Sequence, residues 1–276
     1  MVDAVLLVLR EVLEAALIMS LLLALSHKLQ LHFRWSLSAL LLGFMGSWIL
    51  AQYTYEITEA MDGTGQELLN AVLYFSVVLS VVVLSVLILP LAFTPPLAAH
   101  GRVLDSATSG SRHKFIYGLF IVIVSFSVAR EGSEIWIYLS GFTNQADTIP
   151  SVYIGAAIGT GIGMSLGAII YYAFAFMRKK YFLPIFMVVI TLLACGLSMQ
   201  IAKQLMQIGL LDSAAPLWDS SFLVNEHSWV GELLYALVGY DSRPTPIQGF
   251  FYLLTVTPIL IAGIWHAWRL RVNTHE

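Results

Sequence analysis

Long runs of apolar residues, separated by short polar segments, make up most of this sequence. Seven runs are close to the roughly 20 residues that an α-helix needs to cross the hydrocarbon core of a bilayer. The pattern therefore predicts an all-α membrane protein with seven transmembrane helices in one domain over residues 1–276. The predicted helices are Val2–Leu25, Leu37–Tyr55, Leu68–Phe93, Phe115–Leu139, Val152–Phe176, Phe182–Met206 and Ile247–Trp268.

The composition agrees with this reading. Of the 276 residues, 58% are hydrophobic and 11% are charged, whereas a soluble domain carries about 25% charged residues. The one cysteine, Cys195, rules out an intramolecular disulfide framework. No basic segment precedes the first apolar run, which itself contains charges, so we expect a retained helix rather than a cleaved signal peptide.

Lysine and arginine residues gather in alternate connections, which predicts the orientation of the chain. One side has ten of them and the other side only Arg243, with Lys203 near a helix end. The N-terminus is therefore expected outside and the C-terminus in the cytoplasm. The acidic residues favour the outer connections, either to concentrate cations there or because basic residues are kept inside. The ten are Lys28, Arg34, Arg102, Arg112, Lys114, Arg178, Lys179, Lys180, Arg269 and Arg271.

Two charged motifs interrupt the apolar runs: R-E-V-L-E at Arg10–Glu14 and R-E-G-S-E at Arg130–Glu134. The first lies on a helix running inward and the second on a helix running outward. This indicates an inverted repeat, in which residues 1–93 match 115–206 and a seventh helix, 247–268, is appended. Glu11 and Glu131 each lie about nine residues, or roughly 13 Å, below the outer surface, so the two motifs are expected to meet near the midplane.

The motifs have the chemistry of a metal site. Because the glutamates of each motif are three residues apart, they share a helix face, and four carboxylates can converge: Glu11, Glu14, Glu131 and Glu134. Two arginines, Arg10 and Arg130, would orient them and offset two charges, leaving a surplus of about two negative charges for a cation. Oxygen ligands suit hard ions such as Fe³⁺, Mn²⁺, Mg²⁺ or Ca²⁺.

Other interpretations of the polar residues stay open. Each arginine could pair with its own glutamates as a structural salt bridge, although two motifs in inverted halves favour a shared site. Ser127 and Ser133 are close enough along the helix to line that site. Glu56 and Glu59 repeat the two-carboxylate spacing without an arginine, which suits either an access site for ions or, preferably, a solvated helix end.

Small residues indicate how the helices pack. Gly155, Gly159, Gly163 and Gly167 recur every four residues, a stripe that lets a second helix approach closely. Gly43 and Gly46 form a weaker counterpart in the second predicted helix. We assign these stripes to packing rather than to chemistry.

Two further classes of function are disfavoured. A retinal receptor needs a lysine deep in its last helix, and Ile247–Trp268 contains none. A metal-dependent intramembrane hydrolase would need ligand sets such as H-E-x-x-H, which the sequence lacks. We therefore expect a transporter, not an enzyme, with no organic cofactor and no nucleic-acid partner; homo-oligomerisation is left open.

At the paired motifs the chain resembles the oxidase-dependent iron permeases, which include fungal high-affinity and bacterial EfeU-type permeases. Asp105-Ser106-Ala107 is similar to a short acidic signature of that family, and Gly231–Tyr240, with Val238-Gly239-Tyr240, to the EfeU end region. Val12 stands where the family usually has glycine, and Ser133 where leucine is common. Relatives assigned to other metals, such as lead, make selectivity an open point.

The resemblance implies uptake of iron, ferric rather than ferrous, across a bacterial inner membrane through the glutamates of both motifs. It also implies a periplasmic partner that oxidises or delivers the iron. A permease or proton-coupled antiporter for another ion, such as Fe²⁺, Mn²⁺ or Pb²⁺, is the alternative.

Overall fold

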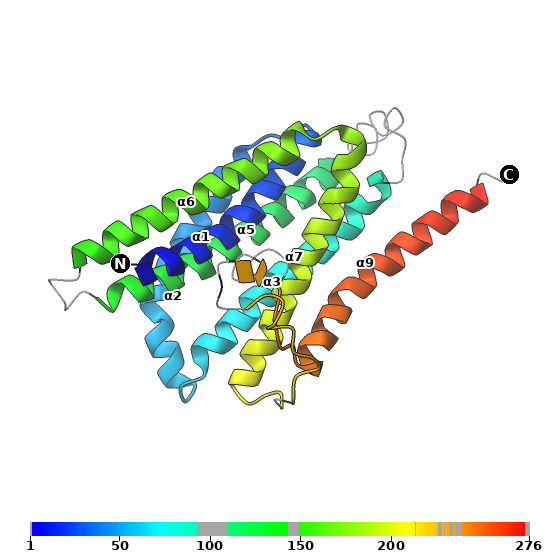
Figure 1. Cartoon of the computed structure of the whole chain (residues 1–276). Helices are drawn as coiled ribbons and strands as arrows, with labels where there is room; N and C mark the ends of the chain where they lie inside the picture. The colour runs from blue at the N-terminus through cyan, green and yellow to red at the C-terminus, as the bar shows by residue number, and fades with distance from the viewer. Residues whose placement is uncertain are drawn as a thin grey trace.

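The computed structural model describes residues 2–92, 110–142, 149–212, 214–225, 228, 230–231, 234–235 and 239–273. Within these ranges the chain forms seven long α-helices (Figure 1). The acidic signature at Asp105–Ala107 lies outside the described residues. The helices are α1 (Val2–Lys28), α2 (Arg34–Ala60), α3 (Gly65–Ala92), α5 (Gly110–Ser140), α6 (Ile149–Phe176), α7 (Lys179–Gln207) and α9 (Pro246–Asn273).

The seven predicted helices are confirmed, and each extends a few residues beyond its predicted apolar run. Six of them are long and apolar enough to cross a membrane. The exception is α1, which is 27 residues long but carries the three charges of the first motif. Ionisable residues at membrane depth are costly unless they face a polar interior, so α1 requires partners for these charges.

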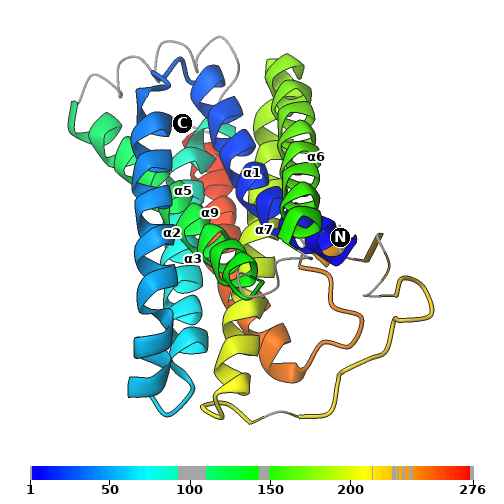
Figure 2. The same cartoon turned by 90° about the vertical axis from the view of Figure 1, so that its left-hand side faces the viewer.

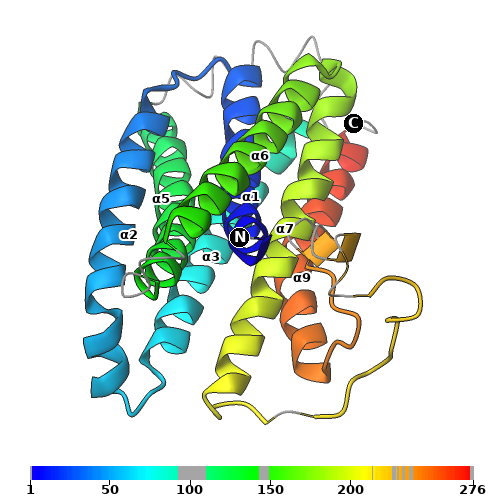
Figure 3. The ribbon, with the colours of Figure 1, turned by 60° about the vertical axis from the view of Figure 1, so that its left-hand side comes forward.

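The helices associate in a crossed pattern. The most extensive contacts join α1 to α6, α2 to α5 and α3 to α7, while α1 also meets α5. Figure 2 shows the α1–α6 pair on one side of the bundle and the α2–α5 pair on the other. The last helix, α9, packs against α7 and α3 at the edge of the bundle (Figure 3). Each motif helix therefore pairs with the second helix of the other predicted half.

Glycines make these pairs close. A Cβ atom added to Gly159 of α6 would lie 2.6 Å from the carbonyl oxygen of Val5 and 3.3 Å from the Val8 side chain. A Cβ atom added to Gly43 of α2 would lie 3.3 Å from the carbonyl oxygen of Ser125 and 2.7 Å from Val128. The predicted glycine stripes thus lie against the motif helices, as close helix packing in membranes requires.

The two contacts are equivalent with respect to the motifs. Val8 lies two residues before Arg10, and Val128 lies two residues before Arg130. Ser125 and Val5 each lie five residues before the arginine of their motif. The α2–α5 and α1–α6 pairs therefore repeat the same helix register relative to the motifs.

Two serines also join the helix pairs. The Ser20 hydroxyl donates to the carbonyl oxygen of Gly167 at 2.7 Å, and the Ser125 hydroxyl donates to that of Ala39 at 3.1 Å. Hydrogen bonds of this kind contribute to helix association in lipid, where the hydrophobic effect does not.

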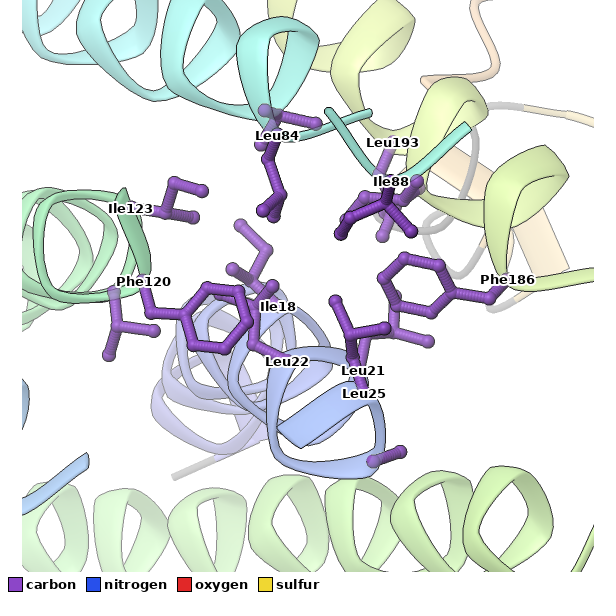
Figure 4. Packing of buried hydrophobic residues seen from close by; sticks show 14 of the residues in the cluster. Ile18, Leu21, Leu22, Leu25, Leu84, Ile88, Phe120, Ile123, Phe186 and Leu193 are labelled. Atoms are coloured by element: carbon purple, nitrogen blue, oxygen red, sulfur yellow. The ribbon is translucent and has the colours of Figure 1, made fainter. Parts of the chain in front are cut away.

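An apolar core fills the half of the bundle beyond the motifs, toward the end where α1 ends (Figure 4). It takes side chains from α1, α3, α5 and α7, including two fully buried phenylalanines, Phe120 and Phe186. The labelled members are Ile18, Leu21, Leu22, Leu25, Leu84, Ile88, Phe120, Ile123, Phe186 and Leu193. The polar motif residues therefore lie beside a closely packed apolar layer, on its side nearer the start of α1.

Large apolar side chains are exposed on the outer faces of the bundle. They include Leu37, Leu41 and Trp48 on α2, Ile158 and Ile162 on α6, and Leu260, Ile261 and Ile264 on α9. Such a surface is unsuited to water but matches the hydrocarbon of a bilayer.

Candidate metal site

The four motif glutamates converge on a single guanidinium group, that of Arg130. Its Nη1 lies 2.8 Å from Glu134 Oε1, and its Nη2 lies 3.1 Å from Glu14 Oε2 and 3.7 Å from Glu11 Oε2. The same guanidinium forms a bidentate ion pair with Glu131, in which Nε donates to Oε1 at 3.1 Å and Nη2 donates to Oε2. The predicted meeting of the two motifs is thus present in the structure.

These groups are deeply buried. Arg130 is 5% exposed, and Glu11, Glu14 and Glu131 are 3–7% exposed. Glu134 is the most accessible of the four, with 28% of its side chain exposed. A buried charge is tolerated only with close partners, so the cluster depends on the mutual compensation of carboxylates and guanidinium.

Three of the glutamates form a group with the spacing of metal ligands. One oxygen each of Glu11, Glu131 and Glu134 lies within 4.8 Å of the others. Glu11 Oε2 accepts no hydrogen bond from the part of the chain that the structure describes. Because a hard cation holds its oxygen ligands at about 2.0–2.6 Å, these three oxygens would have to move closer together to share one ion.

Arg10 has a different environment. Its Nε lies 3.5 Å from Glu14 Oε1, but 42% of its side chain is exposed. Its guanidinium carbon lies 4.5 Å from the centre of the Tyr235 ring, and Lys203 Nζ lies 5.7 Å from the same ring. Burial raises the pKa of Tyr235 to about 12, so a neutral phenol faces both cations. Arg130 therefore lies at the centre of the carboxylate cluster and Arg10 at its edge.

The segment between α7 and α9 reaches Arg10 because it returns into the bundle. Gly239 has φ +67° and packs so closely on Gly196 of α7 that any Cβ atom would collide with the α7 backbone. Only glycine adopts this conformation readily. Gly231–Tyr240 lies only partly within the described residues, and its Tyr235 contacts Arg10 of the first motif.

Helix α3 adds two residues that the sequence motifs do not reveal. The Asn70 side-chain amide donates to Glu134 Oε1 at 3.2 Å, and the Tyr74 ring lies 4.2 Å from the Arg130 guanidinium carbon. Both residues are buried. Their spacing of four residues, which places them on one face of the helix, is the signal that could have indicated them.

The other predicted residues have various locations. Ser127 lines a cavity of about 10 Å³ beside Arg130 and Tyr74. The Ser133 hydroxyl donates to the Arg130 carbonyl oxygen at 2.7 Å, which is a bond within its own helix turn. Glu56 and Glu59 are exposed near the end of α2.

A bundle of long apolar helices around a buried cluster of carboxylates is typical of membrane transporters for cations. Over residues 1–268 the chain matches the Iron permease FTR1 family, and it belongs to that family. No solved structure matches the chain.

Named relatives agree with the family. The chain is 25% identical over 166 residues to the ferrous iron permease EfeU of Escherichia coli O6:K15:H31, which covers 59% of the chain and 58% of that protein. It is 25% identical over 164 residues to the ferrous iron permease EfeU of Shigella flexneri, which covers 58% of the chain and 68% of that protein. The match to the Escherichia coli protein thus spans less than two thirds of its length.

Proposed function

We propose that this protein carries iron across a bacterial inner membrane into the cytoplasm, with Glu11, Glu14, Glu131 and Glu134 as ligands of the ion. The observation that supports it is the convergence of four buried carboxylates, from two distant motifs, on one guanidinium. Together with Arg10 the cluster carries a formal surplus of two negative charges, which a metal cation would neutralise.

The proposal includes the predicted orientation. The described basic residues of the connections gather where α1, α3, α6 and α9 end and where α2, α5 and α7 begin. One of them, Lys28, donates to the carbonyl oxygens of Ala175 and Met177 at 2.8 Å each and so caps the end of α6. The bias toward basic residues supports a cytoplasmic location for this end.

The inverted repeat is part of the same proposal. Its support is the shared register of α1 with α6 and α5 with α2, together with the similar charge pattern of the two motifs. Transporters built this way bind substrate where the two halves meet.

The proposed cargo is ferrous iron. The relatives are named ferrous iron permeases, and the expectation of ferric iron has no support from them. The formal surplus of two negative charges suits Fe²⁺ by charge alone. Uptake of radioactive iron into proteoliposomes, with ascorbate to keep Fe²⁺ or citrate to hold Fe³⁺, distinguishes the two; faster uptake with citrate would contradict the ferrous assignment.

The ligand assignment is tested by replacing each of the four glutamates with glutamine. Loss of a direct ligand is expected to lower uptake by at least about tenfold, since even residues that only support a ligand cost that much. The matched control is Asp212→Asn, which neutralises an exposed carboxylate after α7. Correctly inserted glutamine variants that take up iron like the control would refute the assignment.

Selectivity and delivery complete the proposal. Competition by Mn²⁺ or Pb²⁺ that exceeds self-competition by Fe²⁺ would make another metal the cargo. A periplasmic protein that oxidises or delivers iron is proposed from the family resemblance, and stimulation of uptake by added periplasmic extract would test it; unchanged uptake would speak against such a partner.

A further inference from the structure

Arg130 lies among the four carboxylates that the proposed function assigns to the metal. Its guanidinium has five N–H donors in a rigid fork, and it lies between carboxylates of both motif helices. The distances from nitrogen to oxygen are 2.8–3.7 Å for Glu134, Glu14 and Glu11. A hard metal ion binds oxygen at about 2.0–2.6 Å, so the same oxygens cannot enclose both the ion and the guanidinium.

The surroundings of Arg130 give the guanidinium a second support. The face of the Tyr74 ring lies 4.2 Å from its central carbon, a contact favourable to a cation. A cavity of about 10 Å³ adjoins Arg130, with Leu73, Tyr74, Val77 and Leu197 among its lining residues. This cavity, the size of about one water molecule, lies between α3, α5 and α7, next to the guanidinium and the ring.

We propose that Arg130 is a tethered cation that occupies the carboxylate cage until a metal ion displaces its guanidinium along the face of Tyr74. The carboxylate cage is the group of side chains of Glu11, Glu14, Glu131 and Glu134. The proposal rests on the proposed function, because it assigns the four glutamates to the metal. Tyr74 acts as a positioning residue: it contacts the arginine and not the metal.

A resident guanidinium gives the site a means of rejecting monovalent cations. Because it is tethered, its effective concentration at the cage is high, and a monovalent ion that replaces it gains no charge. A divalent or trivalent ion doubles or triples the Coulomb attraction to the same oxygens. Selectivity for highly charged ions thus follows from competition with the Arg130 guanidinium as well as from the carboxylate ligands.

The test measures Fe²⁺ binding by equilibrium dialysis under ascorbate, on the full chain in lipid nanodiscs, with and without about 150 mM NaCl. In the wild type, sodium is expected to change the Fe²⁺ affinity by less than about twofold, because Arg130 already outcompetes it. In Arg130→Gln the cage lacks its resident cation, so sodium is expected to weaken Fe²⁺ binding by about tenfold. Equal sodium sensitivity of the two proteins would overturn the proposal.

Variants of Tyr74 test the proposal where Arg130→Gln does not fold. The carboxylates compensate the charge of the Arg130 guanidinium only while it lies in the cage. The stability of the displaced guanidinium therefore depends more on its contact with the Tyr74 ring. Tyr74→Leu is expected to weaken Fe²⁺ binding by about tenfold, within the range of a buried cation–π contact, whereas Tyr74→Phe keeps the ring face and binds nearly as the wild type. A Tyr74→Leu protein that binds Fe²⁺ like Tyr74→Phe would contradict the displacement.

The same assay separates this inference from the proposed function. If Glu131→Gln binds Fe²⁺ as tightly as the wild type, the glutamates are not ligands and the proposed function fails. If the glutamates are required but Arg130→Gln and Tyr74→Leu behave as the wild type does, only the displacement of Arg130 is refuted.

Discussion

Arg130 and Arg10 hold the same position in two similar motifs, yet Arg130 lies among four carboxylates and Arg10 faces a tyrosine at the edge of the cluster. The motif charges cannot cause the difference, because they are the same in both copies. It arises from their neighbours: Tyr74 of α3 covers Arg130, and Tyr235 of the segment after α7 covers Arg10. A pair of similar motifs thus becomes one site with a centre and an edge.

The largest effect on stability is expected when Arg130 is replaced. Arg130→Ala leaves four carboxylates crowded without their central cation, and losing one partner of a buried ion pair typically costs about 3–5 kcal/mol of the free energy of unfolding. Arg10→Ala removes a half-exposed partner and is expected to cost far less. Thermal unfolding in nanodiscs measures both.

Added metal sharpens the same measurement. Because Fe²⁺ can replace the missing positive charge, it is expected to restore part of the stability of Arg130→Ala by binding the folded state. Equal losses for the two arginine variants would show that the site has no centre and that Arg130 and Arg10 have equivalent roles.

A smaller effect on stability is expected at the close contact between α1 and α6. Gly159→Ala brings a Cβ atom to 2.6 Å from the carbonyl oxygen of Val5, whereas a Cβ atom on the neighbouring Gly161 meets nothing within 4 Å. Overpacking costs about 1–3 kcal/mol, so Gly159→Ala is expected to lower the unfolding temperature. Gly161→Ala, two residues away on the same helix, is the matched control and should leave it unchanged or slightly raised.

The third residue of each motif distinguishes the two halves in a further way. Val12 packs against Gly163 of α6, while a Cβ atom on Gly132 would collide with the Ser47 hydroxyl of α2. Each helix pair therefore joins one larger residue to one glycine: the larger residue is on the motif helix in the α1–α6 pair and on the partner helix in the α2–α5 pair. The departure from the family pattern at Val12 is accommodated by the glycine it faces.

This complementarity predicts a rescue. Gly132→Val alone is expected to destabilise the protein by about 1–3 kcal/mol through overpacking. The double variant Gly132→Val with Ser47→Gly recreates the valine–glycine contact of the other half and should regain most of that loss. A double-mutant cycle measures the coupling; additive effects of the two substitutions would refute equivalent packing in the two halves.

The smallest effect concerns the edge of the site. Tyr235→Leu removes the ring over Arg10 and is expected to cost about 0.5–1 kcal/mol, as for a partly exposed cation–π contact. Iron uptake should fall by about two- to fivefold, which is the same free-energy difference. A loss of uptake as large as that of Glu131→Gln would place Tyr235 in the centre of the site.

The sequence was sufficient for the parts of the molecule that depend on pattern. Apolar runs determine the helices because only helices satisfy their own backbone hydrogen bonds in lipid. Charged motifs in such helices need polar partners, and each motif provides them for the other. The glycine stripe of α6 and the pair Gly43 and Gly46 indicated close packing, and they lie against the motif helices.

The sequence was not sufficient for what depends on tertiary neighbours. Asn70 and Tyr74 are single polar or aromatic residues in an apolar helix, and their role follows from the rotation of α3 relative to α5, which no local pattern encodes. The unequal roles of the arginines also depend on a distant segment, since Tyr235 reaches Arg10 only because Gly239 packs against Gly196. Ser133 was assigned to the site by its position, but its hydroxyl bonds to its own helix.

Anomalous scattering at the iron edge from crystals grown with Fe²⁺ tests the central claim most directly. The account predicts one peak between α1 and α5, at about 2.0–2.6 Å from oxygens of the four motif glutamates. The Arg130 guanidinium is predicted to have left the cage along Tyr74. Iron bound elsewhere, or an iron-free cage with Arg130 still among all four carboxylates, would contradict it.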